Sequence, residues 1–382
     1  MNAFDELLHC GLCGAELRGP VAAFSRLHRV TSDCKPFRAG GVIAECHACG
    51  AALKPGQLQW IRDCEEIYRN YDNYSVTEGA EQSVRGGLDG KQFAPRSQLV
   101  LDRLSQSIEL PAKGRLLDYG CGRGPTAKAA AKKLPGWSID GYDLDRRAEQ
   151  DLKQIPGFEQ LFTGDVADIP QKYDLIVLMH ALEHIPQGVD ALRQLGQLLH
   201  PGGRILVQVP NRIANPFDLV VADHATHFDR ASLYRMVQNS GLAPIVISEN
   251  WVTKELTAVA GHDAAGDPPE AVTTPLAEQV DWLASVADTA RSVMASQPLG
   301  IFGSSIVGTW IRSEIGRPPG FYIDDDQAKQ GRSIEGAPII ALNDAPSDAA
   351  VILAMAPQVA KIVAPRVQEA GLTVVTLPDY PG

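Results

Sequence analysis

The sequence predicts an α/β protein built from more than one domain. Segments with strand and helix character alternate from Gly114 to about Ala260, the rhythm of a doubly wound sheet. A shorter alternating series begins at Leu299, and two Cys-x-x-Cys pairs stand within the first 50 residues. With 382 residues, the chain has room for two or three domains of roughly 100 to 200 residues each.

The N-terminal region, residues 1–75, is predicted to be a small module stapled by zinc, with little helical periodicity. Its two pairs are Cys10-Gly-Leu-Cys13 and Cys46-His-Ala-Cys49, each followed by glycine. Four thiolates suit a closed tetrahedral Zn²⁺ site that contributes folding energy and leaves no open position for catalysis. A redox role is disfavoured because the pair occurs twice and neither copy opens a helix after a strand. Three further side chains are alternative ligands: His9, Cys34 and His47.

Residues 76–265 are predicted to form the central domain. After Pro95, an amphipathic helix covers the sequence RSQLVLDRLSQSI, whose apolar residues recur at helical spacing. The predicted strands are Arg115 to Tyr119, Ser138 to Asp143, Tyr173 to Met179, Arg204 to Val209, Ala243 to Ser248 and Glu255 to Ala260. The predicted helices are Pro125 to Leu134, Gly188 to Leu199 and Arg230 to Ser240. No helix separates the last two strands, so we expect an antiparallel hairpin at one edge of the sheet.

Residues 266–382 are predicted to form a linker helix and a smaller Rossmann-like domain. The stretch Gly261 to Pro275 is rich in Gly, Pro, Asp and Ala and is interpreted as a linker, followed by a helix from Leu276 to about Ala295. Another helix, ending at Glu314, follows the first strand of the domain. The strands are predicted at Leu299 to Phe302, Gly320 to Ile323, Val351 to Ala354 and Thr373 to Leu377.

A glycine-rich turn after the first strand of the central domain predicts a nucleotide-like ligand. Asp118 ends that strand, and Gly120, Gly122 and Gly124 then let the backbone turn tightly against a ligand. Pro125 suits the first turn of the next helix, where its missing N–H is not needed. The turn on its own is weak evidence, because a strand-to-helix connection without a ligand also uses glycine.

Asp143 strengthens the ligand interpretation. It ends the next predicted strand, where a carboxylate can accept both hydroxyls of a ribose. A dinucleotide-dependent dehydrogenase is the alternative, and its G-x-G-x-x-G pattern requires glycine at position 125. Pro125 occupies that position, so the dehydrogenase interpretation is disfavoured.

The segment from Gly114 to Ala260 resembles the class I S-adenosylmethionine-dependent methyltransferases. Besides the glycine turn, it carries YDLIVLMHALEHI followed by LLHPGGRILVQVPN. The resemblance implies S-adenosylmethionine as cofactor and places the adenine amine at Asp165. The predicted cofactor-binding residues are Asp118, Gly120, Gly122, Gly124, Asp143, Leu144, Asp165, Val166 and Tyr74.

The same class places acceptor chemistry after its fourth and fifth strands. His180, Glu183 and His184 follow the fourth strand here, and Asp223, His224 and His227 follow the fifth. A neutral imidazole is a suitable base at physiological pH, and a neighbouring carboxylate can fix its tautomer. We predict His224, His184 and Asp223 as catalytic residues. For each histidine, a purely structural role is the alternative, favoured for His180 and His227.

The order of modules resembles the sugar C-methyltransferases of deoxysugar pathways. Those enzymes join a four-cysteine zinc module, a methyltransferase domain and a Rossmann-like domain, which FGSSIVGTW and GFYIDDDQAKQGRSIEGAPI echo here. In that family the loop after strand five carries Tyr-x-Glu-His, with the Tyr as base. The matching positions are Val221, Ala222, Asp223 and His224. Since Val221 cannot act as a base, a carbon acceptor is in doubt and we favour a hydroxyl.

Three tyrosines precede the central domain at intervals of three residues: Tyr68, Tyr71 and Tyr74. The resemblance implies a lid over cofactor and substrate in this region, which we assign to Tyr74. A helix face packed on the zinc module is the alternative.

Charge and hydropathy narrow the partners. The 46 acidic residues outnumber the 35 Lys and Arg, a net charge of −11 that opposes a nucleic-acid partner. The sequence has no long apolar run and no leader pattern, so we expect a cytoplasmic protein without a membrane partner. The predicted function is methyl transfer to a nucleotide-linked sugar, at a hydroxyl or a carbon, with His224 or His184 as base. The alternatives are a zinc-containing RNA methyltransferase and a non-catalytic binding protein.

Overall fold

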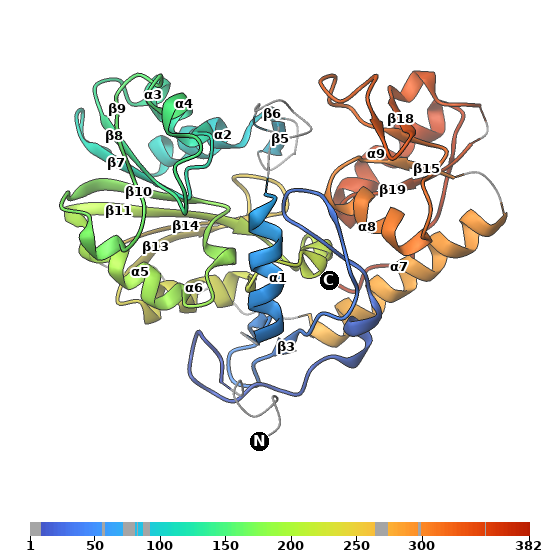
Figure 1. The fold of residues 1–382 in the computed structure, drawn as a ribbon, viewed down its shortest axis with the longest axis horizontal. Coiled ribbons are helices and arrows are strands. Elements are labelled where there is room, and N and C mark those ends of the chain that lie inside the picture. The colour runs from blue at the N-terminus through green and yellow to red at the C-terminus, as the bar shows by residue number, and fades with distance from the viewer. Residues whose placement is uncertain are drawn as a thin grey trace.

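Two α/β lobes flank an N-terminal module in the computed structural model (Figure 1). The structure describes residues 9–55, 58–71, 81, 83–86, 92–263, 274–296, 299–347 and 349–382. Tyr74 and most of the predicted linker, residues 264–273, lie outside the described residues. Within the described part, no helix is long and apolar enough to cross a bilayer.

The central domain is a seven-stranded sheet with strand order β13-β14-β11-β10-β7-β8-β9. The first five strands in chain order pair in parallel and the last two form the predicted antiparallel hairpin at the edge. The strands are β7 (Arg115–Tyr119), β8 (Ser138–Tyr142), β9 (Phe158–Phe162), β10 (Tyr173–Met179), β11 (Leu199–Pro210), β13 (Ala243–Ser248) and β14 (Glu255–Gly261). Six were predicted. β9 was missed because only one of its five side chains is buried, which leaves no apolar pattern.

Helices cover both faces of this sheet. Neighbouring strand residues alternate between two cores, Leu116 on one side and Leu117 on the other. The five helices are α2 (Arg96–Ser107), α3 (Pro125–Lys133), α4 (Glu149–Leu152), α5 (Gly188–Gln197) and α6 (Arg230–Asn239). A short hairpin of β5 (Ser83–Gly86) and β6 (Gln92–Pro95) precedes α2.

The N-terminal module is not confined to its own sequence. Its strands β3 (Ala44–Glu45) and β4 (Ala52–Leu53) form a three-stranded sheet with β12 (Thr226–His227) from the central domain. The remaining elements are η1 (Ala22–Arg26), β1 (Arg29–Val30) and β2 (Pro36–Phe37).

The expectation of little helical periodicity in this module was wrong. Helix α1 (Leu58–Arg69) lies at the centre of the molecule (Figure 1) and buries Trp60, Cys64 and Ile67. Their spacing of four and three residues is helical. The charged residues between them hid this narrow apolar stripe.

The C-terminal lobe has a six-stranded sheet with order β17-β18-β16-β15-β19-β20. Long helix α7 (Leu276–Ser296) leads into it and packs against η1 and η4 (Pro216–Val220), so one core spans the lobe and the N-terminal module. The other elements are β15 (Leu299–Phe302), α8 (Ile306–Ile315), β16 (Phe321–Ile323), β17 (Ser333–Ile334), β18 (Ala337–Ile340), η5 (Leu342–Asp344), β19 (Ala350–Leu353), α9 (Pro357–Glu369) and β20 (Thr373–Val374). The four predicted strands are present; β17 and β18 were missed.

Candidate active site

The glycine turn adopts the conformation that its sequence requires. Gly120, Gly122 and Gly124 have φ values of 77°, 49° and 75°, in the left-handed region that favours glycine. A Cβ on Gly124 would lie 2.6 Å from the side chain of Leu152. The turn therefore closes tightly on the protein.

Asp118 supports this turn from below. Its carboxylate accepts the N–H of Ala127 at 3.2 Å and is buried, which raises its pKa to about 8. Asp118 therefore contacts the first turn of α3 and fixes the start of that helix.

Asp143 lies directly beside the glycine turn. One carboxylate oxygen accepts the N–H of Gly122 at 2.8 Å and the other accepts the N–H of Leu144 at 2.7 Å. A carboxylate oxygen has two lone pairs, so both oxygens can still accept a hydroxyl. The Leu144 side chain is 76% exposed, an apolar surface next to a carboxylate. This pairing fits the ribose and base of a nucleoside cofactor.

Asp165 and Val166 occupy the neighbouring loop at the same sheet edge. Asp165 caps η2 (Val166–Asp168) by accepting the N–H of Ala167 at 2.9 Å, and Val166 is buried. Of the predicted cofactor residues, all but Tyr74 are thus described. Asp118 lies within β7, and the others lie in the segments directly after β7, β8 and β9.

The four cysteines of the N-terminal module converge as predicted. The Sγ atoms of Cys10 and Cys49 are 3.6 Å apart, those of Cys13 and Cys46 are 3.5 Å apart, and all four lie within 4.8 Å of one another. A tetrahedral Zn²⁺ with bonds of about 2.3 Å holds its thiolates about 3.8 Å apart. Among the described residues, this group contains neither His9, Cys34 nor His47. The donor set fits a structural zinc.

His184 stands at the start of the acceptor region, in η3 (Leu182–His184) after β10. Its Nδ1 lies 3.0 Å from the carbonyl oxygen of Asp223 and 3.2 Å from the hydroxyl of Tyr68. Asp223 in turn accepts two hydrogen bonds from Ser32, from the backbone N–H at 2.9 Å and from Oγ at 2.5 Å. Burial, helped by the charge of nearby His224, lowers the pKa of His184 and favours its neutral form.

His224 lies against His184, with the two rings edge to face and 4.7 Å between centroids. Nδ1 of His224 is 2.8 Å from Oδ1 of Asp218, and Nδ1 of His227 is 2.7 Å from Oδ2 of the same carboxylate. Two three-residue groups in this cluster, Glu183–His184–His224 and Asp218–His224–His227, keep their donor atoms within 4.8 Å. Because the Asp218 contacts have hydrogen-bond lengths, we interpret the cluster as a hydrogen-bonded network.

His180 belongs to a second, adjoining network. It ends β10 with a φ of 52°, rare for a residue with a side chain, and lies 3.0 Å from Glu183 and 3.1 Å from Glu255. Burial opposes its protonation, but Glu255 and Glu183 raise its pKa to about 9. Arg96 completes the pairing of Glu255. His180 is therefore held as a paired cation and is not available as a base.

The acceptor loop is fixed by the N-terminal module. Lys54, next to β4, donates its backbone N–H to Ala225 at 2.8 Å and its Nζ to the carbonyl oxygen of Val221. Burial lowers the pKa of this ammonium to about 7. Sequence reasoning missed Ser32, Lys54, Tyr68 and Asp218 as neighbours of the predicted histidines. A polar or charged residue between apolar neighbours, as in Phe217-Asp218-Leu219, was the signal for Asp218.

The acceptor and cofactor regions adjoin. A Cβ on Gly120 would lie 2.9 Å from the Cβ of Ala181, the residue that precedes η3. Glu183, within η3, accepts the N–H of Ala225 through its carbonyl oxygen at 2.6 Å. The glycine turn, η3 and the loop that carries His224 thus form one continuous wall.

Two lysines lie near this wall, Lys329 from the C-terminal lobe and Lys254 from the central domain. Lys329 pairs with Asp324 at 3.0 Å, and Asp324 also accepts from the backbone N–H and Oγ of Ser304. Lys254 directly precedes Glu255, and both ammonium groups act to lower the pKa of the Cys34 thiol, although burial raises that pKa overall to about 11. Parts of all three modules meet at this point.

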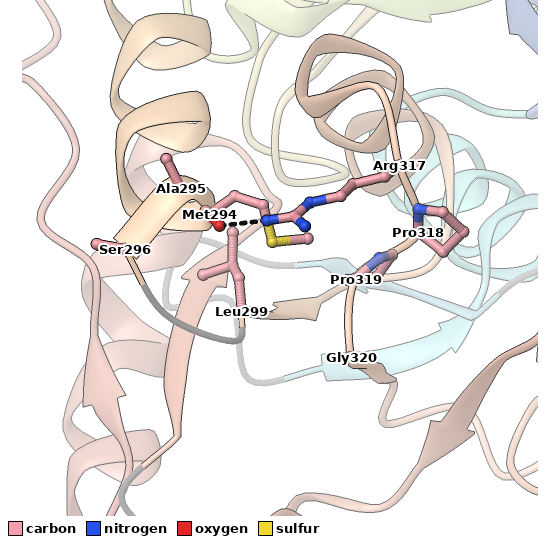
Figure 2. Close-up of a pocket in the computed structure, with 8 residues that line it drawn as sticks. All are labelled: Met294, Ala295, Ser296, Leu299, Arg317, Pro318, Pro319 and Gly320. Carbon is pink, nitrogen blue, oxygen red and sulfur yellow. Dashed lines mark hydrogen bonds between the residues drawn. The ribbon is translucent and has the colours of Figure 1, made fainter.

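A separate hollow of about 450 Å³ lies between the end of α7 and Gly320, far along the chain from the predicted site residues (Figure 2). Arg317 crosses it and donates to the carbonyl oxygen of Met294 at 2.5 Å. Its other lining side chains are apolar or small, and none is a predicted site residue.

Comparison with known proteins identifies the domain. Residues 93–247 match the family described as a methyltransferase domain. The ubiquinone biosynthesis O-methyltransferase of Aeromonas salmonicida (strain A449) is 26% identical over 155 residues, which cover 34% of this chain and 62% of that protein. The enzyme of the same name from Ralstonia nicotianae is 27% identical over 165 residues, covering 40% of this chain and 68% of that protein.

Among solved structures, the CalO1 methyltransferase of calicheamicin biosynthesis, in its SAH-bound form, aligns with 43% of this chain and 53% of its own. The sequence identity of this alignment is 19% and its TM-score is 0.35. The family match, the glycine turn and the carboxylate beside it establish the class: the chain contains a class I S-adenosylmethionine-dependent methyltransferase domain. The match covers less than half of the chain, and this chain spans less than two thirds of the first relative named above.

Proposed function

We propose that this protein transfers a methyl group from S-adenosylmethionine to a sugar, at a hydroxyl or a carbon, with His224 or His184 as the base. The observation that supports this most directly is the pair of histidines, each contacted by an aspartate residue, beside the glycine turn. Neither ring is held in a double ion pair like that of His180. Two potential bases at the edge of the cofactor site suit removal of a proton from the acceptor.

Different residues bind the cofactor, remove the proton of the acceptor and orient the histidines. Gly122, Leu144 and Asp143 bind and orient the nucleoside part of the cofactor, which supplies the methyl group when it is bound. An unprotonated ring nitrogen of His224 or His184 accepts the proton of the acceptor group as that group becomes methylated. Tyr68 and Asp223 hold His184, and Asp218 holds His224. The walls of η3 and the acceptor loop exclude water, since Glu183, Asp218 and Asp223 are all buried.

We propose that the sugar is nucleotide-linked. Lys254 and Lys329 bring two ammonium groups to the junction of the modules, beside the start of α8. Positive charge near a helix N-terminus suits a phosphate group. The C-terminal lobe would then hold the nucleotide while the histidines face the sugar.

We also propose that Cys10, Cys13, Cys46 and Cys49 hold a structural Zn²⁺. Its contribution would be to stabilise the module, because four thiolates leave no position for a substrate. No catalytic step involves it.

A labelled methyl-transfer screen tests the function. Purified protein with S-adenosylmethionine carrying a ¹³C-methyl group would be offered nucleotide sugars, free glycans and RNA. We expect label on a nucleotide sugar, and the NMR spectrum of the product then separates an O-methyl from a C-methyl group. Label on RNA, with binding that weakens steeply with salt, would instead support the RNA methyltransferase.

A further inference from the structure

Asp218 is the residue on which the two buried histidines of the acceptor loop converge. It lies in η4, its side chain is 2% exposed, and each oxygen meets one imidazole. Phe217 and Leu219 on either side belong to the apolar core that η4 shares with α7. The carboxylate is therefore set in a rigid, dry environment with no freedom to choose other partners.

We propose that Asp218 is the positioning residue of the acceptor site, which holds His224 with Nδ1 protonated and Nε2 free to accept a proton. The proposal rests on the proposed function and goes beyond it by naming the residue that sets the tautomer of His224. The chemistry follows from the contact atoms. An ionised carboxylate only accepts hydrogen bonds, so Nδ1 of both rings must carry the proton. In a neutral ring, Nε2 is then the nitrogen with a lone pair.

The two rings held by Asp218 differ in their surroundings. His227 is fully buried in β12, and its Nε2 has no hydrogen-bond partner among the described residues. It cannot reach an acceptor. His224 instead faces Glu183 and His184, at the wall that adjoins the glycine turn. Of the two rings that Asp218 holds, His224 is therefore the one placed to exchange a proton with a substrate.

The charges around the cluster agree with this assignment. Burial opposes protonation of His224, but Asp218, Glu183 and Asp223 raise its pKa above the ordinary value. Burial lowers the pKa of His227 to about 4, with Lys54 and His224 acting in the same direction. These are the charged groups that face the pair from η3, η4, β4 and the acceptor loop. A single carboxylate thus makes one histidine basic while the other remains neutral.

The tautomer of His224 can be measured without any substrate. Protein labelled with ¹⁵N in its histidines gives ring nitrogen shifts that report which nitrogen carries the proton. We expect the Nδ1–H tautomer for neutral His224 in the wild type. In Asp218→Asn, which keeps the shape and removes the charge, the pKa of His224 should fall by about 1 to 3. Asp190→Asn is the matched control, because Asp190 is exposed and pairs only with Arg193 among described side chains; it should leave His224 unchanged.

Two results would overturn the proposal. One is an Nε2–H tautomer of His224 in the wild type, a reading that does not depend on any variant folding. The other is an unchanged His224 pKa in folded Asp218→Asn. If that variant does not fold, His227→Asn serves in its place, because it leaves the contact between Asp218 and His224 intact and must leave the His224 tautomer unchanged.

Activity provides the second readout once an acceptor is known. Asp218→Asn should lower kcat by about 10² to 10⁴-fold with an unchanged KM for S-adenosylmethionine, since a triad-like aspartate acts through its histidine. The acidic limb of the kcat profile should move to lower pH together with the His224 pKa. In a His224→Gln background, Asp218→Asn should cost nothing further, and an additional tenfold loss would contradict the proposal. Failure to find any methylated product would refute the proposed function but leave the NMR result standing.

Discussion

The cofactor edge and the acceptor edge of this protein are built in different ways. The cofactor edge uses residues from one stretch of chain, Asp118 to Val166, and its carboxylates accept mainly backbone N–H groups. The acceptor edge gathers Ser32, Lys54 and Tyr68 from the N-terminal module around two loops of the methyltransferase domain. Cofactor binding therefore depends on local sequence, whereas acceptor chemistry depends on how two modules dock.

Replacing His224 should have the largest effect, and this effect should be confined to the acceptor edge. We expect His224→Ala to lower kcat by about 10² to 10⁴-fold, the usual contribution of a positioned general base. Its affinity for S-adenosylmethionine, measured by calorimetry, should match that of the wild type, because the ring contacts Asp218, His184 and His227 and none of the cofactor residues that the structure describes. Equal turnover in the variant would remove His224 from the catalytic residues.

Loss of zinc should have the next largest effect, again at the acceptor edge. Cys46→Ser is expected to lower the metal content, measured by elemental analysis, and to destabilise the N-terminal module by several kcal/mol. Since β4 pairs with β12, the amides around Thr226 should lose protection in hydrogen exchange, while those of Gly122 and Ala127 keep theirs. Equal loss of hydrogen-exchange protection at both edges would contradict the conclusion that the two edges are built separately.

Replacing Asp143 should affect only the cofactor edge. Asp143→Ala removes the acceptor expected to bind ribose and should weaken S-adenosylmethionine binding by about 10 to 100-fold, as for other hydrogen bonds to a charged group. Asp145→Ala is the matched control, because Asp145 is two residues away and pairs with Arg147 on the surface. A similar loss of affinity in both variants would show that the effect is not specific.

Acid should lower the stability of the folded protein through the buried side chain of His227. The folded pKa of His227 is about 4, below the ordinary 6.5, so the unfolded chain binds a proton in this window that the folded chain does not. Stability should therefore fall as the pH drops from 6.5 towards 4, by up to about 3 kcal/mol from this group. Asp218, whose pKa is lowered, adds to the loss only below its ordinary value of 3.8. Urea denaturation at several pH values would show a flatter slope for His227→Asn, whereas the exposed-site variant His200→Asn should follow the wild type.

The contrast also explains what could be predicted from sequence. The glycine turn, Asp143 and the cysteine pairs are short-range patterns with a direct physical reason, and the structure places them as expected. Histidines 184 and 224 could be proposed from sequence because they follow strand ends, and their catalytic role stays a prediction. Ser32 and Lys54 could not be found, because their role depends on the pairing of β4 with β12, two segments about 170 residues apart in the chain. The narrow apolar stripe of α1 escaped for a different reason, because charged residues stand between its members.

The most direct test of the two separately built edges is a rescue experiment at increasing S-adenosylmethionine concentration. Once a sugar acceptor is known, we expect saturating cofactor to restore most of the turnover of Asp143→Ala and none of that of His224→Ala. Recovery of both variants, or of neither, would contradict this expectation.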